Sequence, residues 1–291
     1  MSYKDTFIGL LIVMIWGMNF VVIAWGLDDF PPLLLGASRF ILIALLGSLF
    51  VRIPSIPWYW LAFYGLSIGF GQFAFLFLGM YAGMPAGLAS LVLQSQVIFT
   101  ILLGVVLLKE SVNSRQITAL TIACVGLIVI ATSVGTPNLT ILGFSLSVIA
   151  AMFWALGNIV TRMIVNKGYK IDLGLVVWSA WFVVPPFIVT SFIFEGSEKI
   201  LLSIEQIKWG TVLAILYLSV FASIVGFGLW SKLLSKYPAS KVAPLSLGVP
   251  LFGFLSAFIF LGESISVQQI TGVVIVFSGL IIIFSGNKKR Q

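Results

Sequence analysis

Long apolar stretches recur along the whole chain and are separated by short breaks rich in charged residues, proline and glycine. Each stretch holds about 20 residues, which at a rise of about 1.5 Å per residue crosses a hydrocarbon core of about 30 Å. The pattern predicts ten transmembrane helices and an all-α integral membrane protein. The predicted spans are residues 6–26, 32–51, 58–79, 85–108, 114–132, 142–163, 173–194, 209–230, 240–261 and 267–285.

The chain also repeats itself. Residues 85–130 and 238–283 align without a gap and share fifteen identical positions, among them Pro85 with Pro238 and Glu110 with Glu263. Each repeating unit therefore holds five spans, and because five is odd, the second unit enters the membrane upside down. This predicts two inverted five-helix repeats, residues 1–132 and 142–285, an architecture typical of secondary transporters.

The basic residues predict how the chain is oriented. Alternate crossings place thirteen of them on one side and only three on the other, a bias that marks the cytoplasmic side. Both termini are then cytoplasmic, and residues 286–291 form a basic cytoplasmic tail. The larger set is Lys4, Arg52, Lys109, Arg115, Arg162, Lys167, Lys170, Lys232, Lys236, Lys241, Lys288, Lys289 and Arg290, and the smaller set is Arg39, Lys199 and Lys208.

The amino-acid composition excludes several classes of function. The 291 residues are 60% hydrophobic and 9% charged, against about 45–50% and about 25% in soluble domains, so no soluble catalytic or nucleic-acid-binding domain fits. Histidine is absent and Cys124 is the single cysteine, which argues against a metal site. No phosphate-binding or hydrolase motif occurs, and no acid lies near the middle of a span. We therefore expect no catalytic residue, no cofactor and no proton relay through a central carboxylate.

Polar residues inside the spans are the candidates for substrate binding, since the bilayer otherwise penalises them. Neutral amides and aromatic rings dominate, and amides can both donate and accept, which suits a zwitterion. Amides also join helices in membranes, and tryptophans also simply pack, so each residue has a structural alternative. The candidates are Trp16, Asn19, Gln72, Ser90, Gln94, Trp154 and Asn158. Because Gln94 and Gln96 point in opposite directions on a helix, one of them is expected to serve packing.

Other residues have competing interpretations. Arg39 either draws a substrate carboxylate, pairs with an acid, or extends to the outer headgroups; the ready snorkelling of arginine favours a structural role. Glu110 and Glu263 occupy matching span ends, which predicts a shared structural task at a helix start. Pro244 and Pro250 interrupt the ninth span and predict a bending or gating element there.

Several of these segments resemble the EamA family of the drug/metabolite transporter superfamily, and within it the O-acetylserine/cysteine exporter type. The resemblance covers nearly the whole chain, with its most specific part in residues 83–94. One departure is Lys109 before Glu110, where the family commonly has glycine, as at Gly262. The matching segments are WGMNFVVI (16–23), SRF (38–40), QFAFLF (72–77), GMPAGLASLVLQ (83–94), GNI (157–159) and VAPLSL (242–247).

The resemblance implies a central pathway between the repeats, alternating access, and export of small amino acids or related metabolites across a bacterial inner membrane. The partners expected are a small-molecule substrate and the lipid bilayer, without nucleic acid, and a monomer is the working expectation. Broad efflux of drugs or lipophilic toxic compounds is the alternative within transport. A membrane-embedded enzyme or a scaffold is the alternative outside it.

Overall fold

The computed structural model describes residues 1–133 and 139–285, and these are helical throughout, with short connections. The predicted basic tail, residues 286–291, lies outside the described residues. Nine helices of the described chain are long and apolar enough to cross a membrane, and the apolar helix Val267–Ile282 is shorter. The predicted fold class, an all-α integral membrane protein, is confirmed.

Six of the predicted spans are continuous helices whose ends lie within a few residues of the prediction. Each begins after a break with a polar or proline residue, such as Thr140, which caps the sixth span by accepting from the Gly143 N–H. They are α1 (Tyr3–Asp29), α2 (Pro32–Phe50), α7 (Ser114–Ala131), α8 (Ile141–Asn166), α9 (Leu173–Phe194) and α15 (Val267–Ser285).

The other four spans are interrupted at matching positions of the two repeats. The third span holds a π-helical segment, η1 (Gly65–Gly71), between α3 (Trp58–Tyr64) and α4 (Gln72–Tyr81). The eighth holds η3 (Tyr217–Val225) between α11 (Trp209–Leu216) and α12 (Gly226–Lys236). Such segments free backbone groups and are frequent at functional sites.

The fourth and ninth spans contain tight 3₁₀ turns instead. The fourth is α5 (Ala86–Val92), η2 (Leu93–Ser95) and α6 (Gln96–Leu108), and the ninth is α13 (Ala239–Val242), η4 (Ala243–Leu247) and α14 (Gly248–Leu261). Proline predicts an interruption only in the ninth span. The fourth is interrupted without proline, so the shared position in the repeat, and not the proline, accounts for both.

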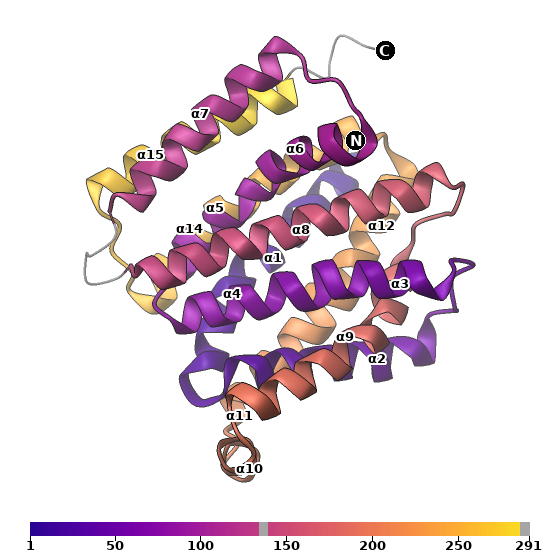
Figure 1. The fold of residues 1–291 in the computed structure, drawn as a ribbon, viewed down its shortest axis with the longest axis vertical. Coiled ribbons are helices and arrows are strands. Elements are labelled where there is room, and N and C mark those ends of the chain that lie inside the picture. Colours follow the sequence, from indigo (N-terminus) through magenta and orange to yellow (C-terminus); the bar gives the residue numbers. More distant parts are fainter. Residues whose placement is uncertain (134–138, 286–291) are drawn as a thin grey trace.

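The repeats pack together through pairs of helices from opposite halves of the chain. Helix α1 packs on α14, α2 on α9, and α4 on α8, while α7 and α15 lie side by side at one edge of the bundle (Figure 1). The largest buried cluster lies where the first, third, fourth and sixth spans meet. A short amphipathic helix that the sequence did not predict, α10 (Ser197–Glu205), protrudes from the bundle beyond α9.

The two matching glutamates have different partners. Glu263 accepts from the backbone N–H groups of Ala86 (2.7 Å) and Gly87 (3.0 Å), at the start of α5. Glu110 instead pairs with Arg162 at 2.7 Å. The predicted shared task is therefore wrong for Glu110, because side chains inside each turn already cap the helices that follow. Asn113 with Gln116 caps α7, and Ser266 with Gln269 caps α15.

Candidate functional site

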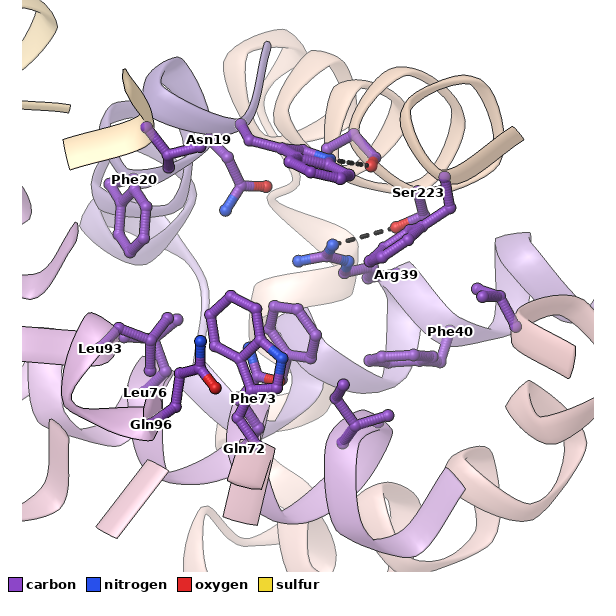
Figure 2. Close-up of a pocket in the computed structure, with 18 of the residues that line it drawn as sticks. Asn19, Phe20, Arg39, Phe40, Gln72, Phe73, Leu76, Leu93, Gln96 and Ser223 are labelled. Atoms are coloured by element: carbon purple, nitrogen blue, oxygen red, sulfur yellow. Dashed lines mark hydrogen bonds between the residues drawn. The ribbon is translucent and has the colours of Figure 1, made fainter. Parts of the chain in front are cut away.

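The interrupted spans surround a cavity inside the bundle. It encloses about 1060 Å³, including its opening, and its lining is mostly apolar and aromatic with several neutral polar groups. Residues from both repeats contribute, and many come from the π and 3₁₀ segments (Figure 2). The polar and Trp/Tyr side chains in the lining are Trp16, Asn19, Arg39, Tyr64, Gln72, Ser90, Gln94, Gln96, Trp154, Ser179, Ser223 and Ser246.

The structure brings together six of the seven candidates that the sequence suggests for substrate binding. The six that line the cavity are Trp16, Asn19, Gln72, Ser90, Gln94 and Trp154. Asn158 does not line it. Its Nδ2 donates to Gln96 Oε1 (2.7 Å) and to Thr100 Oγ1 (3.1 Å), which joins α8 to α6.

Three of the candidates in the lining donate hydrogen bonds to backbone carbonyls. Trp16 Nε1 donates to the Ala222 carbonyl at 2.9 Å, and Ser90 Oγ donates to the Gly87 carbonyl at 2.6 Å. Gln94 Nε2 donates to the Ser246 carbonyl at 3.4 Å and so links η2 to η4. The Trp16 contact joins α1 to η3, the Ser90 contact lies within α5, and only the Gln94 contact joins two interrupted spans.

Two amides of the lining are unsatisfied. Asn19 is 8% exposed and Gln72 4% exposed, and neither Asn19 Oδ1 nor Gln72 Oε1 has a hydrogen-bond partner among the described residues. Buried polar atoms are nearly always hydrogen-bonded, so each exception calls for an explanation. A bound molecule with hydrogen-bond donors would satisfy both oxygens.

Arg39 also faces the cavity, and the snorkelling interpretation is wrong for it. The side chain is 2% exposed and does not extend to a surface. Its Nη2 donates to Ser223 Oγ at 3.0 Å, and its guanidinium lies 4.0 Å from the centre of the Phe73 ring (Figure 2). The π-helical segments of the third and eighth spans both contribute residues to this interior space, which the span pattern alone does not reveal.

The lining is cationic and offers no acidic side chain. Every Asp and Glu of the sequence lies in the described part of the chain, and none lines the cavity. No group of three or more His, Cys, Asp or Glu that could hold a metal ion occurs within residues 1–133 and 139–285. The cavity can therefore bind through amides, hydroxyls, aromatic rings and one guanidinium.

The predicted bending prolines lie next to this cavity. Pro244 falls in the first turn of η4, and Pro250 falls near the start of α14. Because proline lacks an N–H, Pro250 cannot donate to the Ser246 carbonyl, which accepts from Gln94 Nε2 instead. Between the two prolines, Ser246 and Val249 line the cavity. Bending at these prolines stays a prediction.

Several residues that line the cavity were not identified from the sequence. Ser179, Ser223 and Ser246 are serines of a type common in membrane helices, and Tyr64 reads as an interfacial aromatic residue. Gln94 and Gln96 both line the cavity, so the expectation that only one of them faces it is wrong; Gln96 also accepts from Asn158 Nδ2. Only the folded chain separates these side chains from others of the same type.

Known proteins match the chain along its whole length. The EamA-like transporter family matches residues 5–132 and, a second time, residues 141–285. The "Probable amino-acid metabolite efflux pump" of Salmonella typhimurium is 43% identical over 293 residues, covering 100% of this chain and 98% of that protein. The protein of the same name from Escherichia coli is also 43% identical over 293 residues, with the same coverage.

Proteins with lower sequence identity also match nearly the whole chain. Protein PecM of Dickeya dadantii is 26% identical over 281 residues, covering 94% of this chain and 92% of that protein. One crystal structure superimposes with a TM-score of 0.64 at 16% identity, covering 100% of this chain and 99% of its own, and at that identity it supports the fold alone.

Proposed function

Because this chain belongs to the EamA-like transporter family, it is a membrane transporter and not an enzyme, and we propose that it exports small neutral amino acids such as cysteine or O-acetylserine. The relatives that are 43% identical carry the name of an amino-acid metabolite efflux pump, which supports an exported metabolite of this class.

The observation that carries the proposal is the chemistry of the cavity lining. Neutral amides that can donate and accept are combined with aromatic walls, and no acidic side chain lines the cavity. A compact zwitterion matches such groups better than a metal ion or a polyphosphate does. The binding residues we propose are Trp16, Asn19, Gln72, Ser90, Gln94 and Trp154. We assign Asn158 instead to joining helices, on the basis of its two hydrogen bonds.

Alternating access is the proposed mechanism. Two repeats of opposite orientation can rock around a central site, and the interrupted helices beside the cavity supply deformable joints. Pro244 and Pro250 are the proposed bending points in the ninth span. The chain would lie in a bacterial inner membrane with both termini in the cytoplasm, as the distribution of basic residues favours.

Broad efflux of lipophilic compounds is the second candidate, and the aromatic lining favours it. Phe20, Phe40, Phe73 and Phe227 line the same space as the two tryptophans. Aromatic walls accept many apolar molecules, whereas buried amides favour polar ones.

Counterflow separates the two candidates. Purified protein is reconstituted in liposomes preloaded with unlabelled cysteine or O-acetylserine, and entry of the labelled amino acid is followed, with protein-free liposomes as the control. Saturable counterflow that lipophilic cations do not inhibit supports the amino-acid exporter. Absence of amino-acid counterflow, together with transport of lipophilic compounds, supports broad efflux instead.

A further inference from the structure

The cavity wall contains a buried cation whose charge and donors are not satisfied. Arg39 Nη2 donates to Ser223 Oγ at 3.0 Å, whereas Nε and Nη1 have no hydrogen-bond partner among the described residues. A guanidinium stays charged in proteins, so Arg39 cannot become neutral by losing a proton. An uncompensated charge at this depth in a membrane protein is unfavourable and usually marks a functional site.

The acids that could neutralise Arg39 are engaged elsewhere or lie at helix ends. Glu195 accepts from the N–H groups of Leu33 (2.7 Å) and Leu34 (3.1 Å) at the start of α2, the helix that carries Arg39. The other acids with described partners are Asp5 with Lys236, Asp29 with Lys208, Glu110 with Arg162, Asp172 with Gly174, and Glu263 with Ala86 and Gly87. No described ion pair includes Arg39.

The fold holds the guanidinium in place without neutralising it. Ser219 Oγ donates to the Arg39 carbonyl at 3.0 Å, and Ser223 Oγ in turn donates to the Leu218 carbonyl at 2.8 Å, so the segment η3 fixes both ends of the residue. Phe73 stacks on one face of the guanidinium. Arg39 Nε and Nη1 are not accessible to solvent. A group that binds them must therefore displace a neighbouring side chain, and Phe73 is the ring that contacts the guanidinium.

We propose that Arg39 binds the carboxylate of the transported molecule, and that a free carboxylate is therefore required of every substrate. The proposal rests on the proposed function and names the chemistry that the same cavity recognises. A carboxylate can accept from two guanidinium donors at once, and this pairing is stronger and more directional than a neutral hydrogen bond. Asn19 and Gln72 line the same cavity, and their unsatisfied oxygens suit the ammonium group of an amino acid.

Competition against counterflow of labelled cysteine by the unaltered protein tests the requirement. Cysteine, cysteine methyl ester, cysteamine and 3-mercaptopropionate differ in which of the two charged groups they keep. The ester and cysteamine, which lack the carboxylate, should compete about tenfold or more weakly than cysteine, as expected for loss of hydrogen bonds to a charged group. 3-Mercaptopropionate, which keeps the carboxylate, should still compete. Equal competition by cysteine and cysteamine overturns the proposal.

Variants assign the requirement to Arg39. Arg39→Gln should abolish the preference for cysteine over cysteamine, and Arg39→Lys should restore part of it. Arg162→Gln is the matched control, because it removes an arginine that lies outside the cavity lining, and it should leave the preference unchanged. An Arg39→Gln protein that exchanges cysteine and keeps the full preference overturns the proposal. If Arg39→Gln does not fold, the competition series on the unaltered protein decides.

Direct binding separates failure of this proposal from failure of the proposed function. If no amino acid undergoes counterflow, the exporter proposal fails, and thermal stabilisation of the purified protein by 3-mercaptopropionate is compared with stabilisation by cysteamine. Stabilisation by the carboxylate alone, lost in Arg39→Gln, supports a carboxylate site for another class of substrate. Equal or absent stabilisation by both compounds overturns the role of Arg39.

Discussion

Two polar regions inside the bundle are built from similar side chains but differ in how their hydrogen bonds are met. Around Asn158, an amide, a second amide and a hydroxyl satisfy one another across α8 and α6. In the cavity wall, Asn19, Gln72 and Arg39 keep atoms without partners. The first region joins two helices, although its Gln96 also lines the cavity, and we propose that the second region binds the substrate.

The comparison shows why amide residues in a membrane sequence are hard to interpret individually. An amide that finds a partner on a neighbouring helix contributes modestly to helix association. An amide with a buried polar atom that lacks a hydrogen-bond partner lowers the free energy of unfolding, and a bound molecule that supplies the hydrogen bond restores it. Asn19 and Asn158 therefore look alike in the sequence, each a few residues after a tryptophan in the first span of its repeat, yet have different surroundings.

The largest effect is expected when the two amides with unsatisfied oxygens, Asn19 and Gln72, are replaced by apolar residues. Asn19→Leu and Gln72→Met, made singly, should reduce counterflow about tenfold or more, because each removes a hydrogen-bonding group from the proposed site. The thermal midpoint should stay constant or rise, since an unsatisfied buried polar atom is lost. Counterflow and thermal unfolding in detergent measure the two effects. A lower thermal midpoint with normal counterflow would show that these residues join helices, as Asn158 does, and do not bind the substrate.

The next effect concerns the two matching glutamates, of which Glu263 is partly buried at a helix start and Glu110 is exposed. Glu263→Ala should lower stability by about 1–3 kcal/mol, because two backbone donors of α5 lose a charged acceptor. Glu110→Ala should lower it by about 0–1 kcal/mol, because the side chains of Glu110 and Arg162 are each 45% exposed. Unfolding in detergent under matched conditions measures both. Equal losses would show that Glu263 does not hold α5 through these bonds.

A smaller effect than that of Glu263→Ala is expected at Asn158. Asn158→Ala should lower stability by about 0.6–2 kcal/mol, the range for such contacts between membrane helices, while cysteine counterflow persists. Thr161→Val is the matched control, since Thr161 Oγ1 bonds only the Gly157 carbonyl of its own helix. Loss of counterflow in Asn158→Ala, without loss of stability, would assign this residue to the substrate site.

The sequence by itself determines the membrane fold. The length of each apolar stretch sets the number and limits of the spans, because a segment in lipid must satisfy its backbone internally and be long enough to cross. The repeated Pro85/Pro238 and Glu110/Glu263 positions reveal two related halves. Most of the polar residues selected as candidates also line the cavity, since polar groups such as Asn19 and Gln72 are rare within apolar spans; their role in binding stays a prediction.

Only the tertiary structure decides which polar groups face the cavity and which find partners. Hydrophobic length carries no information on rotation about the helix axis, so Asn158 and Asn19 could not be separated. The π segments of the third and eighth spans arise from packing between helices and have no proline to mark them. Arg39 could be interpreted as a surface anchor, because the span pattern does not show that an interior cavity lies beside it. The direction in which a side chain points, and the partners it meets there, is decided only when distant spans pack together.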